Sequence, residues 1–236
     1  MSVEGCIRKE CISRIISDVK EITVNPLHEQ NIYYQHDEDN ILNGYALIIG
    51  TKDTPYENGY YFFRFVFPID YPYKPPTVYY LTNDGITRFH PNLYRNGKCC
   101  LSILNTWKGD EWTSCITLST ILLSLCILFT DNPLIHEPGI SKNHNEIEYY
   151  NDIIKYKNYE VAFYGILKKR GFIYNLFSNF IEKHFIENKS DILNNLENEN
   201  KRNKKVKKIT VSVYDMIDIE INYSKLIKNI KKIEIK

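Results

Sequence analysis

The stretch "YYFFRFVFPIDYPYKPPTVYYL" (residues 60–81) decides the fold class, because it holds two β-prone segments on either side of a rigid bend. Aromatic and β-branched residues fill both segments and favour strands. The prolines of the bend cannot occupy a central strand, since they lack a backbone N–H; they are Pro68, Pro72, Pro75 and Pro76. Two strands joined by a short ordered loop are predicted to run antiparallel.

Two further β-prone segments precede this stretch, "NIYYQ" (residues 31–35) and "GYALIIGT" (residues 44–51). The pair Asn58-Gly59 is a turn signal and stands directly before the third segment. Strands in direct succession with tight turns predict a four-stranded antiparallel meander.

Helices are predicted before and after the meander. Near the N-terminus, apolar residues recur at helical steps of three and four; they are Ile12, Ile15, Ile16, Val19 and Ile22. Residues 82–113 have little periodicity, which is typical of a long functional loop. A central helix is predicted to begin near Thr117, a suitable N-cap. The fold class is therefore α+β, with helices segregated from the sheet.

The chain is predicted to have three parts. Residues 1–140 form the core and residues 141–200 a helical C-terminal extension. Residues 201–236 are predicted to be a basic linker and a short C-terminal tail, because "KRNKKVKK" (residues 201–208) is a typical solvated charge run. Binding of an acidic partner by this run is the alternative. Within the last part, residues 209–221 alternate like a strand and residues 223–236 suit a short helix or a frayed end.

Composition excludes several classes of partner. The 236 residues include 30 Lys+Arg and 29 Asp+Glu, so net charge favours neither nucleic acid nor membrane, and we expect neither as a partner. The longest apolar run, residues 121–129, is far shorter than the roughly 20 residues that span a bilayer. We expect a protein of the cytoplasm and/or nucleus with reduced cysteines. The six cysteines lack paired C-x-x-C spacing, so we expect no metal and no cofactor.

Several motifs occur in order along the core. They are a Tyr-Pro-x-x-Pro-Pro bend (residues 71–76), a His-Pro-Asn triplet and a Cys-Leu pair in "FHPNLYRNGKCCLSIL" (residues 89–104), and a Trp in "EWTSCITLSTILLSLCILFTDNP" (residues 111–133). Together they resemble the ubiquitin-conjugating enzymes and their UBC fold. The segments "LSILNTW" (residues 101–107) and "NPLIHEPG" (residues 132–139) are most similar to the large Z-type subclass.

The resemblance implies an activity. Such enzymes accept ubiquitin as a thioester from an activating enzyme and pass it to a lysine of a substrate protein, usually with a ligase. Spacing alone does not choose between the adjacent cysteines. In the family the nucleophile lies eight positions after the motif Asn and precedes Leu, which selects Cys100, since Asn92 and Leu101 match. Cys99 is then expected to be a small buried hydrophobe of little reactivity.

The resemblance also implies roles for three neighbours of Cys100. Asn92 supplies an amide donor to the negative charge that develops on the thioester oxygen, or else holds the loop that shapes the site. His90 is expected to be a structural hydrogen-bonding group rather than a base. Glu137 stands where the family often carries an acid that orients the incoming lysine. A solvent-facing role for Glu137 is an equal alternative.

Partner surfaces follow from the same resemblance. The activating enzyme is expected to meet the first helix through Arg8, Lys9 and Arg14, with an ordinary solvated face as the alternative. Ligases are expected at Tyr73 of the Pro-rich bend and at the loop around Trp112.

The sequence departs from the family at two places and leaves alternatives open. Many members have Ser-Pro-Ala after the Trp, where this chain has "TSC" (residues 113–115), and Ser102 stands where Asp is common. Both departures leave the ligase class undecided. A carrier for a ubiquitin-like modifier is one alternative, and a non-catalytic binding module is another. Inactive relatives lack the cysteine, so the presence of Cys100 with Asn92 favours an enzyme.

Overall fold

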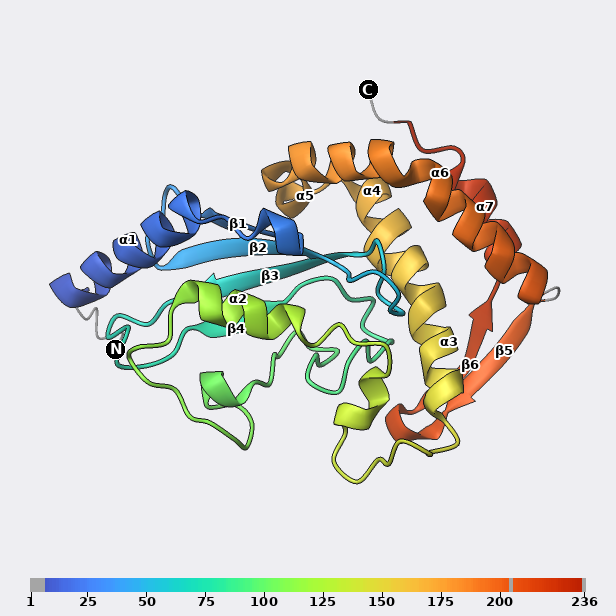
Figure 1. Ribbon diagram of the computed structural model, residues 1–236, viewed down its shortest axis with the longest axis horizontal. Helices are drawn as coiled ribbons and strands as arrows, with labels where there is room; N and C mark the ends of the chain where they lie inside the picture. Colours follow the sequence, from blue (N-terminus) through green and yellow to red (C-terminus); the bar gives the residue numbers. More distant parts are fainter. Residues whose placement is uncertain (1–6, 204–205, 235–236) are drawn as a thin grey trace, which may run out of the picture.

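The computed structural model describes residues 7–203 and 206–234 (Figure 1). Cys6 and residues 204–205 of the basic run lie outside the described residues. The α-helices are α1 (Lys9–Val24), α2 (Leu118–Cys126), α3 (Ile147–Lys157), α4 (Ile166–Lys169), α5 (Phe172–Leu176), α6 (Ser178–Arg202) and α7 (Tyr223–Ile230). The strands are β1 (Ile32–His36), β2 (Asn43–Ile49), β3 (Tyr60–Val66), β4 (Thr77–Tyr80), β5 (Lys207–Val211) and β6 (Met216–Ile221).

The predicted meander is confirmed. Strands β1 to β4 form one antiparallel sheet in chain order. The bend between β3 and β4 carries the four prolines, as the stretch of residues 60–81 predicts. Helix α2 begins after Thr117, whose side chain accepts a hydrogen bond from the backbone N–H of Thr120, so the predicted N-cap is confirmed.

Helices cover both faces of the sheet. On one face, Tyr61 of β3 packs against Phe129, which follows α2, with ring centroids 4.4 Å apart. On the opposite face, Phe62 contacts Phe177 between α5 and α6, because successive side chains of a strand point to opposite sides. In Figure 1, α5 and α6 lie above the sheet, and α2 is drawn over β3 and β4.

Helix α1 is attached to the segment that leads into α2. The Arg14 guanidinium donates to the carbonyl oxygens of Ser114 and Ile116, the latter at 2.6 Å, and its Nε lies 3.0 Å from Asp18 Oδ1. Asp18 is buried and also accepts from the hydroxyl of Tyr71 in the Pro-rich bend. A buried carboxylate needs such partners, so these contacts fix the helix, the bend and the loop relative to one another.

The helical extension shares the core of the sheet. Helix α3 continues into a π-helix, η4 (Asn158–Gly165), whose Phe163 stacks on Tyr60 at 5.6 Å. Asn158 is fully buried; it accepts from the Tyr61 hydroxyl at 2.6 Å and donates to the Glu57 carbonyl at 2.8 Å. One apolar cluster therefore includes residues of the sheet and of the extension.

The end of the chain is folded where a basic linker and tail were predicted. The strand pattern of residues 209–221 corresponds to β5 and β6, and the short helix predicted from residue 223 corresponds to α7. Helix α6 continues to Arg202, and β5 and β6 form an antiparallel hairpin that is followed by α7. Lys207, within the basic run, places its Nζ 2.8 Å from Asp152 Oδ2 of α3. Apolar side chains lie on one buried face of the hairpin. Their burial stabilises the hairpin although many neighbouring residues in the sequence are charged. The buried apolar residues are Ile209, Val211, Met216, Ile219 and Ile221.

We predict that Asn158→Ala lowers the free energy of unfolding by about 1–3 kcal/mol, because it leaves the buried Tyr61 hydroxyl and Glu57 carbonyl without their partner. Urea denaturation followed by circular dichroism measures the change. Asn143→Ala, at an exposed position of the loop before α3, is the matched control and should unfold like the wild type. Equal stability of the two variants would contradict the assigned role of Asn158.

Candidate active site

The segment after β4 folds back along that strand and carries both cysteines. Bridges join Tyr79 to Lys98 and Leu93 to Cys99, and the Tyr80 N–H donates to the Gly97 carbonyl at 2.7 Å. Gly97 has a φ of +87°, a conformation that other residues rarely adopt. The tight turn at this glycine places the cysteines beside the edge of the sheet.

Asn92 and Cys100 are joined by two hydrogen bonds. The Asn92 side-chain amide donates to the Cys100 carbonyl at 2.6 Å, and the Cys100 N–H donates to the Asn92 carbonyl at 2.9 Å. Asn92 is 8% exposed. The amide is thus engaged with the backbone of the cysteine, which fits the second of the two predicted roles, support of the loop.

His90 uses both ring nitrogens within the protein. Its Nδ1 accepts from the Asn92 N–H at 3.0 Å, so its Nε2 carries the proton and faces His136 Nδ1 at 3.1 Å. Burial, reinforced by electrostatic repulsion between a protonated His90 and its neighbours His136 and Arg88, holds the pKa of His90 well below its usual value. A neutral imidazole with both nitrogens occupied fits the predicted structural role. The partner His136 was not assigned a role from the sequence, although it lies in the quoted segment of residues 132–139.

The two adjacent cysteines differ in their surroundings. Both are 2% exposed, but Cys99 packs within the apolar cluster, of which Cys100 is not a member. Burial raises the pKa of the Cys99 thiol strongly, and the neighbouring Cys100 raises it further. A thiol that resists ionisation is a poor nucleophile, so the surroundings favour Cys100 over Cys99.

Arg88 supports the backbone on the other side of the motif. Its guanidinium donates to the carbonyls of His90 at 3.2 Å and Pro91 at 2.6 Å, and it lies 3.4 Å from the ring centroid of Tyr94. The Tyr150 hydroxyl of α3 donates to the Arg88 carbonyl at 2.7 Å. The sequence analysis assigned no role to Arg88; its contacts to His90, Pro91 and Tyr94 are local, whereas the one from Tyr150 comes from 62 positions away.

Glu137 follows a short 3-10 helix, η3 (Pro133–His136), and is partly buried. Its Oε2 accepts from the Tyr214 hydroxyl at 2.6 Å. Burial and the neighbouring Glu137 carboxylate raise the pKa of Tyr214. The phenol therefore stays protonated and can donate this hydrogen bond. Glu137 therefore has a protein partner, which the predicted solvent-facing alternative did not include.

The predicted contact residues on α1 fall into two groups. Arg8 and Lys9 are exposed at the start of the helix. Arg14 instead points to the loop before α2 and holds Ser114 and Ile116. The structure thus brings Arg8 and Lys9 to the surface and gives Arg14 an internal contact, since its long side chain reaches the unpaired carbonyls of that loop.

The predicted ligase surface is divided in the same way. Tyr73 is 63% exposed on the Pro-rich bend. Trp112 is only 9% exposed; its Nε1 donates to the Pro72 carbonyl at 2.7 Å and its ring lies 5.9 Å from that of Tyr71. Trp112 therefore connects its own loop to the Pro-rich bend through a buried contact. An indole ring can be buried at low cost when its N–H has a hydrogen-bond acceptor.

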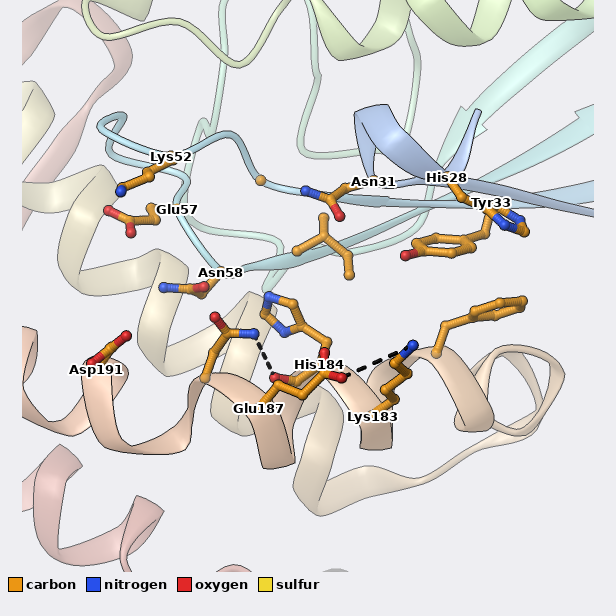
Figure 2. A pocket seen from close by; sticks show the side chains of 14 residues that line it. His28, Asn31, Tyr33, Lys52, Glu57, Asn58, Lys183, His184, Glu187 and Asp191 are labelled. Atoms are coloured by element: carbon orange, nitrogen blue, oxygen red, sulfur yellow. Dashed lines mark hydrogen bonds and ion pairs between the residues drawn. The ribbon is translucent and has the colours of Figure 1, made fainter. Parts of the chain in front are cut away.

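A hollow of about 590 Å³ lies between the sheet and α6. Figure 2 shows His28 and Tyr33 on the sheet side, opposite Lys183, His184 and Glu187 of α6. None of the predicted catalytic residues lines it. This hollow follows the junction of the core with the extension and is separate from the cysteine loop.

Two features are absent from residues 7–203 and 206–234. In that part of the chain, no helix combines the length and apolar character needed to cross a membrane. The same residues contain no cluster of three or more His, Cys, Asp or Glu side chains arranged to hold a metal ion.

Comparison with known proteins identifies the family. The family model for the ubiquitin-conjugating enzyme matches residues 14–159, and the chain belongs to this family. The match covers the sheet, the cysteine loop, α2 and α3. The predicted UBC-type α+β fold and family membership are confirmed.

The most similar relatives include Z-type members. The chain is 37% identical over 181 residues to ubiquitin-conjugating enzyme E2 Z of Xenopus tropicalis, covering 75% of this chain and 57% of the relative. It is 36% identical over 181 residues to the human E2 Z, covering 75% and 51%. It is 38% identical over 171 residues to a probable ubiquitin-conjugating enzyme of Caenorhabditis elegans, covering 67% and 23%. The chain lies close to the Z-type subclass and spans about half the length of these Z-type relatives.

We predict that the protein loses stability as the pH falls from about 6.5 to about 4.5. Burial lowers the pKa of His90 and His136, and lowers that of His184 to about 4. The unfolded chain therefore takes up protons near the ordinary histidine pKa of about 6.5 that the folded chain does not, so the stability present above that pH is lost below it. Urea denaturation at a series of pH values measures this. A free energy of unfolding that is constant or rises over this range would contradict the prediction.

Proposed function

We propose that this protein is a ubiquitin-conjugating enzyme that accepts ubiquitin as a thioester on Cys100 and transfers it to a lysine of a substrate protein. The observation that carries the proposal is the pair of hydrogen bonds between Asn92 and Cys100, within a loop that the family model matches. The raised pKa of the Cys99 thiol makes Cys99 a poor nucleophile, which supports the choice of Cys100.

Loading and transfer are both substitutions at the thioester carbonyl carbon. In loading, the Cys100 thiolate attacks the thioester on the activating enzyme, a new C–S bond forms, and the activating enzyme's cysteine leaves as a thiolate. In transfer, the lysine nitrogen forms a C–N bond, the C–S bond breaks, and Cys100 leaves as a thiolate while the amine gives up a proton. Loading needs no dedicated base, because a cysteine thiolate is both a good nucleophile and a good leaving group.

Asn92 and His90 prepare the loop for this chemistry. The Asn92 amide holds the Cys100 carbonyl, and His90 holds the Asn92 N–H, so the nucleophile starts from one backbone conformation. A fixed conformation lowers the cost of reaching the transition state, in which reacting atoms must be aligned. Glu137 is assigned the orientation of the incoming amine, since a carboxylate attracts an ammonium group and accepts its proton.

Partner contacts are proposed from exposure and charge. Arg8 and Lys9 are exposed cations at the start of α1 and suit an acidic surface of the activating enzyme. The exposed ring of Tyr73 suits an apolar pocket on a ligase.

We predict that Cys100→Ala abolishes a thiol-sensitive adduct with ubiquitin, and that Cys100→Ser forms an adduct that resists thiols, since an alkoxide leaves less readily than a thiolate. The assay combines the protein with ubiquitin, its activating enzyme and ATP, followed by non-reducing gels. Cys99→Ser is the matched control and should still load. An adduct that survives Cys100→Ala and disappears with Cys99→Ser would move the site to Cys99.

We predict that Asn92→Ala leaves loading largely intact and slows discharge to free lysine by about 10²–10³. Attack by a neutral amine is the harder step and depends more on an ordered loop or an oxyanion donor. Single-turnover discharge of the preloaded protein measures the rate. Asn143→Ala, at an exposed position outside the cysteine loop, is the control and should discharge like the wild type. Slow loading with a normal discharge rate would contradict the assignment.

A further inference from the structure

The turn between β5 and β6 meets the active-site loops at three points. This turn is the 3-10 helix η5 (Ser212–Tyr214), and all three contacts are made by Tyr214. Its hydroxyl donates to Glu137 Oε2 at 2.6 Å, and its carbonyl accepts from the Arg95 guanidinium. Its ring centroid lies 5.4 Å from the guanidinium carbon of Arg88, the residue that holds the His90 and Pro91 carbonyls.

The position of this turn is itself fixed. Glu146, at the start of α3, accepts from the Ser212 N–H at 3.0 Å, from the Ser212 hydroxyl at 2.5 Å and from the Val213 N–H at 3.2 Å. The Tyr214 ring also packs 5.8 Å from that of Tyr150 on α3. A carboxylate that receives three hydrogen bonds leaves little freedom to the turn, so Tyr214 is presented to Glu137 from a rigid support.

The same contacts lead back to the nucleophile in a short series of hydrogen bonds. Glu137 directly follows His136, whose Nδ1 faces His90 Nε2 at 3.1 Å. His90 accepts from the Asn92 N–H, and Asn92 donates to the Cys100 carbonyl. The turn thus acts on the loop segment that carries Glu137 and on the segment that leads to Cys100.

We propose that Tyr214 is a positioning residue for the transfer step, acting through Glu137; this inference rests on the proposed function. Tyr214 holds Oε2 of the carboxylate, which leaves Oε1 as the acceptor for the incoming lysine amine. A glutamate side chain has several rotatable bonds, and restraining them before the amine arrives removes an entropic cost from the transition state. Nothing in this role touches the loading step, in which no amine takes part.

The test is single-turnover discharge of ubiquitin-loaded protein to free lysine at several lysine concentrations. Tyr214→Phe removes only the hydroxyl and keeps the ring and the carbonyl. We expect the maximal discharge rate to fall about tenfold, with the half-saturating lysine concentration and the loading rate unchanged. Glu137→Gln should fall at least as far, and the double variant should discharge no more slowly than Glu137→Gln alone. Tyr149→Phe, an exposed tyrosine on α3, is the matched control.

A second variant distinguishes a positioning effect from a folding defect of Tyr214→Phe. Glu146→Ala keeps Tyr214 intact but removes the three hydrogen bonds that anchor its turn, so discharge should slow while loading stays normal. Melting temperatures of all variants show whether any lower rate reflects loss of folded protein.

Four results would overturn the inference. These are normal discharge by Tyr214→Phe, equal slowing of loading and discharge, independent and additive effects of Tyr214→Phe and Glu137→Gln, or normal discharge by Glu146→Ala. Failure of the proposed function has a different signature, because the wild type would then not load, or its adduct would survive Cys100→Ala. In that case the inference about transfer fails with it, at the loading stage.

Discussion

The two hydrogen bonds between Asn92 and Cys100 hold together the loop on which the candidate site depends. This segment has little regular secondary structure, so its backbone groups need partners from side chains and neighbouring turns. His90 and Arg88 supply further partners on the N-terminal side of the same loop. A buried polar network in which each member is paired favours one conformation of the loop. Breaking any one hydrogen bond would leave a buried polar group without a partner, which costs free energy.

The C-terminal extension takes part in this arrangement as well as in the core. It covers the face of the sheet that α2 leaves open, through contacts such as Phe62 with Phe177 and Tyr60 with Phe163. Its final hairpin then reaches the loops beside the cysteine through Tyr214. The stability of the extension and the order of the active-site loops are therefore linked, because the same segment contributes to both.

Much of the fold and part of the site were predictable from local patterns. The alternation and turn signals of residues 31–81 predicted the sheet, and Thr117 predicted the start of α2, because both are set by contacts within a few residues. The sequence placed Arg14 and Trp112 on partner surfaces, but the structure turns both side chains inward. Whether a long amphipathic side chain is exposed depends on whether a backbone carbonyl far away in the sequence lies within its reach. The local periodicity of the sequence does not reveal such a distant partner.

The sequence by itself determined the strand order, the family and the short spacing between Asn92 and the adjacent cysteines, since these are properties of neighbouring residues. Only the tertiary structure decided which cysteine lies in the apolar cluster and which side chains meet across the chain. Arg95 and Tyr214 are 119 positions apart, and Glu137 and Tyr214 are 77 positions apart. Such pairs form only when the packing of the sheet and its helices brings their backbones together, and this depends on the whole core at once.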